Sequence, residues 1–171
     1  MLHVRSHSAL VAALILVFVT PLVARAQAPT PVSWAVRVPE VSALKTGTEV
    51  TVLLTATVAP GWHIYSLTQK PGGPIPMSIT VPAGEPFVLA RAIKGPKPEI
   101  QSDATLDVPI ELYSGTAEFP VALKLTVTGA GAVLEGRITT RYQVCSDTTC
   151  LPPRNITLPV RVELRTNDGA R

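Results

Sequence analysis

The sequence is short of aromatic residues, charges and cysteines. Aromatic residues make up 5% and charged residues 16% of its 171 positions, and there are 2 cysteines. No apolar run after residue 25 is long enough for a membrane-spanning helix, and the 17 prolines argue against a helical bundle. The 46% of hydrophobic residues is too much for a disordered chain. These features exclude a collagen-like, coiled-coil or polytopic membrane protein.

The first 26 residues have the features of a secretory signal peptide. A weakly basic start precedes the short apolar stretch Ala9–Val19, and Ala24-Arg25-Ala26 has the small-x-small form that signal peptidase cleaves. The alternative, a retained membrane anchor, is disfavoured because the apolar stretch is short for a bilayer. We therefore expect residues 1–26 to be removed and residues 27–171 to form one exported domain.

The charge balance offers no binding surface for nucleic acid. The formal net charge is +3, but Arg5 and Arg25 lie in the signal peptide, so the mature chain carries about +1. Charges of both signs are interspersed along it, and no basic cluster is present. We expect no nucleic-acid partner.

Hydrophobic residues alternate along the chain, and helical periodicity is almost absent. In Thr48–Val58 the apolar side chains share one parity and three threonines share the other, which predicts a half-buried strand. Leu134–Val144 and Ile156–Leu164 show the same pattern. Shorter candidate strands are Val32–Val38, Trp62–Leu67, Met77–Val81, Phe87–Ile93, Pro109–Tyr113 and Ala117–Val127.

Turn residues separate these segments, for example at Lys45-Thr46-Gly47 and Gly129-Ala130-Gly131. Many short strands with frequent turns predict an all-β fold, an immunoglobulin-like antiparallel β-sandwich. A small barrel is the alternative.

The two cysteines, Cys145 and Cys150, flank four polar residues between two predicted strands. In an exported protein they are candidates for a disulfide, and a hairpin loop of this length places its flanking residues within reach of one. If Cys145 faces Cys150 and the strands pair without interruption, Ile138 lies opposite Thr157. The apolar residues of the last strand are instead Ile156 and Leu158, on either side of Thr157. We therefore expect a one-residue offset, with a bulge at Pro152-Pro153.

The residues alone leave two roles open for the disulfide, a structural staple or a bond that undergoes exchange. Closing so short a loop stabilises a domain by only about 2 kcal/mol, which is little for a chain with its own core. Cys145 also shares its parity with Arg137, Arg141 and Gln143, opposite to the apolar residues of the same segment. On this pattern we expect the pair near the outer surface, where a partner thiolate reaches it.

A metal site is a weaker interpretation of the cysteines. The candidate ligands after residue 26 are Cys145, Cys150, His63 and Met77, and a second cysteine pair for a closed zinc site is lacking. Copper(I) on the two thiolates with Met77 or His63 is the remaining alternative. We expect no metal and no other cofactor.

Two segments resemble a known family. Tyr142–Pro153, with the letters YQVCSDTTCLPP, is similar to the cysteine segment of the N-terminal periplasmic domain of the thiol:disulfide interchange protein DsbD. Pro60–Tyr65, with the letters PGWHIY, resembles an earlier strand of that domain, and Pro71–Pro74 matches a Pro-Gly-Gly-Pro stretch of family variants. The likeness extends from about Trp34 to Leu164.

This resemblance implies an immunoglobulin-like periplasmic domain that relays reducing equivalents, as in cytochrome c biogenesis. Cys145 and Cys150 would be its redox pair. The reaction is thiol–disulfide exchange, and by analogy Cys150 is the attacking cysteine.

Family members shield the disulfide with aromatic side chains and a cap loop. Tyr65 and His63 match such positions and share one parity, opposite to that of Trp62. Aromatic residues such as Tyr65 and Trp62 are, however, more often packing residues than functional ones. Tyr142 is a further candidate for shielding. The cap would correspond to Lys94–Asp107, which has no aromatic residue.

The chain departs from the best-known members in two ways. They place five residues between the cysteines, whereas this chain has four, and they continue into a membrane domain and a thioredoxin-like domain, whereas this sequence ends at Arg171. The resemblance therefore implies a membrane thiol reductase as electron donor in trans. Thioredoxin-like periplasmic proteins or disulfide isomerases would be the acceptors. The alternative from another class is a non-catalytic binding or assembly module with a structural disulfide.

Overall fold

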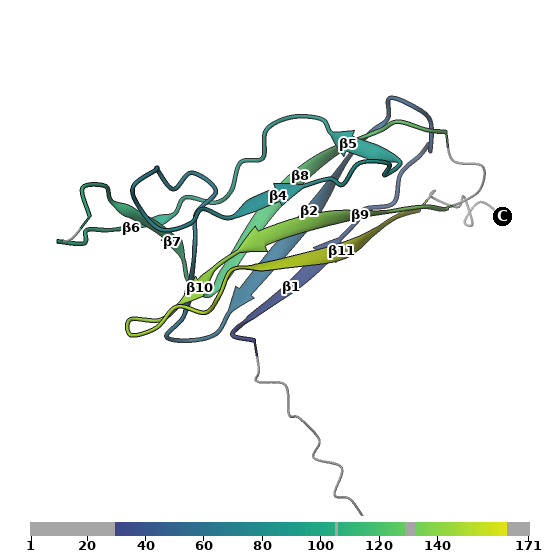
Figure 1. Cartoon of the computed structure of the whole chain (residues 1–171). Coiled ribbons are helices and arrows are strands. Elements are labelled where there is room, and N and C mark those ends of the chain that lie inside the picture. The colour runs from purple at the N-terminus through teal and green to yellow at the C-terminus, as the bar shows by residue number, and fades with distance from the viewer. Residues whose placement is uncertain (1–29, 105, 129–132, 164–171) are drawn as a thin grey trace, which may run out of the picture.

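The computed structural model describes residues 30–104, 106–128 and 133–163, which form β-strands in three antiparallel sheets (Figure 1). The predicted signal peptide, the turn at 129–131 and Leu164 lie outside these ranges. None of the described segments is a helix with the length and apolarity needed to cross a membrane. The all-β prediction is confirmed, with open sheets in place of the alternative closed barrel.

The first layer is a four-stranded sheet in the order β1-β2-β8-β5. Its strands are β1 (Val32–Arg37), β2 (Glu49–Val58), β8 (Thr116–Leu125) and β5 (Phe87–Leu89). The alternation predicted for the β2 segment is confirmed, because every second side chain from Val50 to Val58 is buried. The sheet thus turns one apolar face towards the interior.

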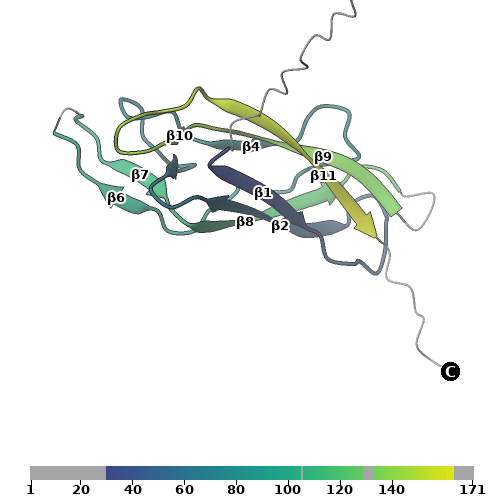
Figure 2. The same ribbon diagram turned by 90° about the horizontal axis from the view of Figure 1, so that it is seen from below.

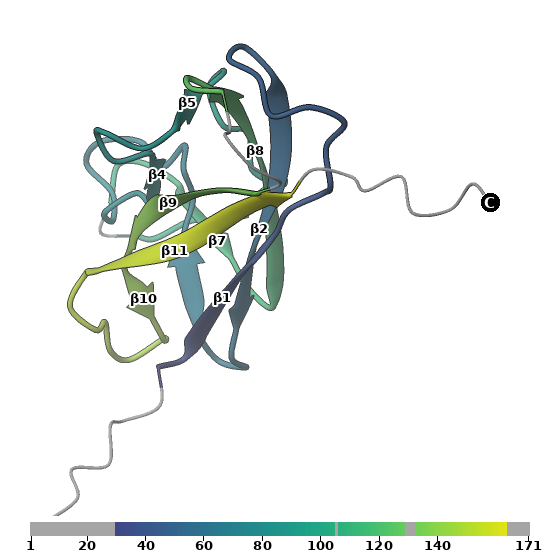
Figure 3. The ribbon, with the colours of Figure 1, turned by 90° about the vertical axis from the view of Figure 1, so that its right-hand side faces the viewer.

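The second layer has two sheets, in the orders β11-β9-β4 and β10-β3-β7-β6. The strands of the first are β11 (Arg154–Glu163), β9 (Val133–Tyr142) and β4 (Ser78–Thr80). The strands of the second are β10 (Val144–Cys145), β3 (His63–Tyr65), β7 (Ile110–Tyr113) and β6 (Glu99–Gln101). Figure 2 shows β4, β9 and β11 on one side and β2 and β8 on the other, with β6, β7 and β10 at one end. Figures 1 and 3 show the edge strand β1 beside β11.

The buried apolar residues form two separate clusters. The main cluster fills the sandwich, and its largest members include Phe87, Phe119 and Tyr142. The small cluster consists of Tyr65, Leu112 and Cys145, with a partly buried neighbour, Ile110. Since all of its members belong to β3, β7 and β10, the sheet β10-β3-β7-β6 carries apolar residues on both of its faces.

The predicted register offset beside the cysteines is confirmed. Leu158 pairs with Ile138 along β11 and β9, whereas Cys145 pairs with Cys150 beyond the ends of these strands. The intervening segment Leu151–Pro153 therefore has one residue more than Gln143 and Val144, which lie opposite. Two hydrogen bonds hold the longer segment in place. The Leu151 amide donates to the Val144 carbonyl at 3.0 Å, and the Gln143 side-chain amide donates to the Leu151 carbonyl at 3.2 Å.

Two predicted elements differ from the structure. Within Lys94–Asp107, where no strand was predicted, Glu99–Gln101 forms β6 against β7. All three of its side chains are exposed, so it lacks the apolar alternation that identifies a strand. The strand predicted over Phe87–Ile93 is shorter, because ladder pairing with β8 ends at Leu89.

Gly136 offers a test of the sandwich packing. A Cβ atom there would lie 2.5 Å from Cε1 of the fully buried Phe87 and 2.9 Å from Oε2 of Glu85, which accepts a hydrogen bond from the Arg137 amide. We expect Gly136→Ala to lower the free energy of unfolding by about 1–3 kcal/mol in urea titrations. Arg141→Ala, an exposed change on the same strand, is the matched control. Equal stability of the two variants would contradict this packing.

Candidate redox site

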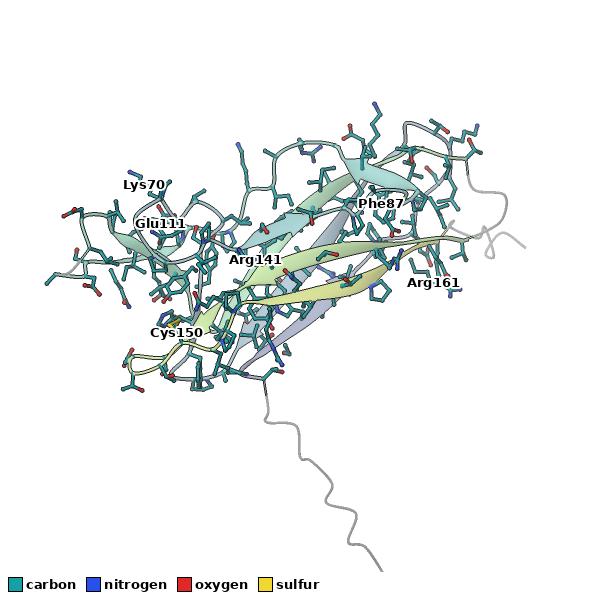
Figure 4. All side chains as sticks on the ribbon, viewed as in Figure 1. Lys70, Phe87, Glu111, Arg141, Cys150 and Arg161 are labelled. Atoms are coloured by element: carbon teal, nitrogen blue, oxygen red, sulfur yellow. A yellow bond between two sulfur atoms is a disulfide. The ribbon has the colours of Figure 1, made fainter. Side chains whose placement is uncertain are left out.

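The cysteines close a small loop at one end of the sandwich. Cys145 ends β10, and Cys150 follows four residues that bond among themselves: the Ser146 amide donates to the Thr149 carbonyl at 2.8 Å, and Ser146 Oγ accepts from the Thr149 amide at 3.2 Å. The two sulfur atoms form a disulfide, with the Cα atoms 4.1 Å apart. In Figure 4 the labelled Cys150 lies at the end that carries β6, β7 and β10, away from Phe87 and Arg161.

The two sulfur-bearing residues differ in exposure. Cys145 is buried, with 1% of its surface exposed, whereas Cys150 is exposed. The expectation that both cysteines lie near the outer surface is therefore wrong for Cys145. Its strand, β10, pairs with β3 and not with β11. The face of β10 that parity along the chain assigns to solvent is covered by Tyr65 and Leu112. Of the two half-cystines, Cys150 is therefore the one that a partner thiol can approach from solvent.

His63 and Tyr65 lie on the cysteine face, as their shared parity predicts. His63 is the cross-strand partner of Cys145, and paired residues of antiparallel strands project from the same face of the sheet. Tyr65, two residues further, places its hydroxyl oxygen 3.9 Å from Cys150 Sγ. The rings of His63 and Tyr65 meet edge to face with centroids 5.4 Å apart. Ile64, between them, points into the main core.

Burial sets the protonation of both rings. It lowers the pKa of His63, while the carboxylates of Asp147 and Glu99 act in the opposite sense. Burial also raises the pKa of Tyr65, so its phenol stays protonated at neutral pH and remains a hydrogen-bond donor. The site therefore combines one neutral imidazole with one phenol.

Tyr142 does not join this cluster, which corrects its choice as a shielding residue. It is buried in the main core, where its ring lies 5.2 Å from that of Trp34. The physical reason is parity: Tyr142 shares the face of Val144, which belongs to the same core, and Cys145 occupies the opposite face. Sequence resemblance near the cysteines was a poor guide to the direction of this side chain.

The predicted cap segment borders the site from the side of β6. A groove of about 230 Å³ lies here, and its lining includes Gln101 of β6, Leu112, His63 and Asp147. Glu99, also on β6, is close enough to influence the pKa of His63. Sequence reasoning missed Leu112 as a member of this site. Its only signal was its position within a predicted strand.

A larger groove, of about 730 Å³, lies elsewhere on the molecule. Residues of β1, β9 and β11 and of the segment 38–40 that follows β1 line it, and none of them is a cysteine or histidine. Its charges are largely paired with one another, since Arg161 contacts Glu135 at 3.0 Å and Glu163 at 2.8 Å. It therefore offers no chemistry comparable to that of the disulfide.

The described residues contain no group of three or more His, Cys, Asp or Glu side chains that could hold a metal ion. Met77, considered as a copper ligand, is buried in the main core, which does not include Cys145.

Comparisons with known proteins agree with this geometry. The family described as "Thiol:disulfide interchange protein DsbD, N-terminal" matches residues 31–161. Among solved structures, the N-terminal periplasmic domain of ScsB from Proteus mirabilis has a TM-score of 0.51 and 18% sequence identity, over 80% of this chain and 47% of that one. This chain thus spans about half the length of that structure, and the likeness supports the immunoglobulin-like fold. No curated protein matches the sequence.

The contact of Tyr65 with the cysteines predicts a shielding effect. Because Tyr65 covers Cys145 and touches Cys150 Sγ, we expect Tyr65→Ala to speed the reaction of the disulfide with a small thiol about tenfold. Stopped-flow measurement of reduction provides the rate. Trp34→Ala is the control, because Trp34 packs against the main core, where its ring contacts those of Phe119 and Tyr142. Identical rates in wild type and Tyr65→Ala would remove Tyr65 as a shield.

Stability is expected to depend on the charge of His63, the only histidine after residue 26. Its pKa is lowered from 6.5 in the folded protein, so between the folded pKa and 6.5 the unfolded chain binds more protons. The free energy of unfolding is therefore not reduced by protonation of His63 above pH 6.5, and it falls as the pH drops from 6.5 towards the folded pKa. Urea unfolding between about pH 7.5 and pH 5.5 tests this, since carboxylates titrate mainly below that range.

His63→Gln is the control for that measurement, because glutamine does not titrate. The variant is expected to lose the part of the pH dependence that belongs to the histidine. The same pH slope in wild type and variant would show that His63 does not titrate differently on folding.

Proposed function

The chain belongs to the family of the N-terminal domain of the thiol:disulfide interchange protein DsbD, and from this premise we propose that it relays reducing equivalents between exported thiol proteins. As a member it is a thiol–disulfide interchange domain. The observation that carries the relay proposal is the unequal exposure of the pair, with Cys150 open to a partner and Cys145 buried behind it.

Reduction of the pair begins at the exposed sulfur. A donor thiolate attacks Cys150 Sγ, the bond to Cys145 breaks, and Cys145 Sγ takes the electron pair. A second thiolate of the donor then attacks the donor sulfur of this mixed disulfide and releases Cys150 as a thiolate. With two protons taken up, Cys145 and Cys150 end as thiols and the donor ends as a disulfide.

Delivery to the acceptor reverses these steps. The Cys150 thiolate attacks a disulfide of the oxidised partner and displaces one of its sulfurs. Cys145 then attacks Cys150 Sγ, which reforms the internal disulfide and releases the partner as a dithiol. Cys150 is thus the sulfur that meets both partners, and Cys145 is the one that resolves the mixed disulfide.

The partners follow from the family. We propose a membrane thiol reductase as the donor and thioredoxin-like periplasmic proteins or disulfide isomerases as acceptors, with cytochrome c biogenesis as one setting. The similar ScsB domain is a periplasmic one, and this supports a periplasmic location. A signal peptide over residues 1–26, removed after export, would direct the chain there.

The competing function is a binding or assembly module with a structural disulfide. The burial of Cys145 favours it, because a buried half-cystine is less accessible to reductants. The exposure of Cys150 favours exchange. The two functions differ in how readily the folded protein loses the bond.

The reduction potential separates these two functions. We expect a value above about −300 mV, with both thiols trapped by alkylation of the native protein in graded thiol buffers, because a partner-accessible sulfur allows exchange. A much lower potential, or thiols trapped only after unfolding, would make the bond a staple.

Single-cysteine variants are the matched controls for this experiment. Cys145→Ser leaves the exposed Cys150, and we expect a maleimide to label it rapidly in the folded state. Cys150→Ser leaves the buried Cys145, which we expect to react at least about tenfold more slowly. Equal labelling of the two variants would contradict the assignment of Cys150 as the sulfur that meets partners.

A further inference from the structure

Breaking the disulfide places a negative charge where the protein is least able to accommodate it. When a partner attacks Cys150, the electron pair moves to Cys145 Sγ, in a residue that is 1% exposed and packed with Tyr65 and Leu112. A thiolate among apolar side chains is costly because it loses its hydration. The buried sulfur therefore needs a proton as the bond breaks, and it must lose that proton before it attacks in the return step.

One titratable side chain is placed to serve Cys145 from the facing strand. His63 is its direct cross-strand partner, so the two side chains leave the same face of the sheet side by side. His63 is partly exposed and lines the groove of about 230 Å³ together with Gln101 and Asp147. His63 is thus both a cross-strand neighbour of the buried cysteine and part of the lining of an open groove.

We propose that His63 is the acid–base group of this site, passing a proton between Cys145 Sγ and solvent. During reduction the imidazolium gives its proton to the departing Cys145 sulfur. During delivery the neutral imidazole accepts the Cys145 thiol proton as that sulfur attacks Cys150 Sγ. This inference rests on the exchange function proposed above, and it assigns to His63 a role separate from shielding.

The groups that face His63 suit this exchange of protons. Asp147 of the cysteine loop and Glu99 of β6 act on it from two other elements, and their carboxylates stabilise the imidazolium when it forms. Burial opposes them and keeps the imidazole neutral at neutral pH, which is the form that a base requires. Tyr65, on the same strand, presents its ring edge to His63.

Tyr65 does not compete for the same role. Its hydroxyl oxygen lies 3.9 Å from Cys150 Sγ, and its raised pKa makes it a poor base at neutral pH. It instead suits donation of a hydrogen bond to a Cys150 thiolate. Tyr65 would then donate a hydrogen bond to the sulfur of Cys150, and His63 would exchange a proton with the sulfur of Cys145.

A two-phase reaction isolates the step assigned to His63. The reduced protein is mixed with the aromatic disulfide dithiobis(nitrobenzoate), and the released nitrothiobenzoate is followed by its absorbance. Attack by Cys150 releases the first equivalent and leaves a mixed disulfide. Attack by Cys145 on Cys150 Sγ releases the second equivalent and reforms the internal bond, so only the second phase requires Cys145 to lose its proton.

His63→Gln is the main variant, because glutamine keeps a polar side chain of similar size. We expect it to slow the second phase at neutral pH by at least about tenfold and to leave the first within about threefold. The second phase of wild type should level off above the pKa of His63. In the variant it should keep rising with pH, because only thiolate formed beforehand can attack.

Chemical rescue provides a second measurement. In His63→Ala, free imidazole added to the buffer is expected to accelerate the second phase, whereas wild type is expected not to respond. Cys145→Ser should release a single equivalent and so identifies the phases. If His63→Gln fails to fold, His63→Asn and the rescue comparison carry the test.

The outcomes separate this inference from the exchange function. Two phases that His63→Gln leaves unchanged in rate and pH profile, with no rescue by imidazole, would overturn the role of His63 and leave exchange intact. A folded, reduced wild type that releases no nitrothiobenzoate, or never reforms its disulfide, would instead contradict the exchange function itself.

Discussion

The site depends on one short strand with apolar surroundings on both sides. In β10, Val144 enters the sandwich core and Cys145 enters the small cluster with Tyr65 and Leu112. Two consecutive buried residues are possible only because β10 pairs with β3 in a sheet that is covered on each face. This pairing also brings His63 opposite Cys145 and Tyr65 within reach of Cys150.

The same constraint makes the disulfide asymmetric. One sulfur belongs to a strand and is held by packing, while the other follows a polar loop and reaches solvent. In the proposed relay both properties have a use, because a partner reaches one sulfur and the second is held in place until the mixed disulfide has formed. A bond with two exposed sulfurs would lose this order, and one with two buried sulfurs would exclude partners.

Much of this arrangement could be predicted from local pattern. Alternation located the buried face of β2, and shared parity placed His63 and Tyr65 on the cysteine face. Pairing of Cys145 with Cys150 did not agree in register with the apolar alternation around Leu158. This mismatch predicted the extra residue in Leu151–Pro153.

Other features depend on contacts between distant segments, and these the local pattern does not contain. Parity along β9 predicts that the Cys145 side chain points away from the main core. It does not predict that this side chain is buried, because the residues that cover it, Tyr65 and Leu112, are distant in the sequence. Strand β6 has no alternation of its own and is defined by its pairing with β7.

The separation of the two clusters bears on how the protein can change redox state and stay folded. The main cluster holds the sandwich together and does not include Cys145. The disulfide closes a loop between residues only 5 apart, so in the chain-entropy model its loss costs about 2 kcal/mol. Reduction therefore disturbs the small cluster at one end of the molecule and leaves the sandwich core in place. A domain built in this way can keep its fold while the pair at one end is oxidised or reduced.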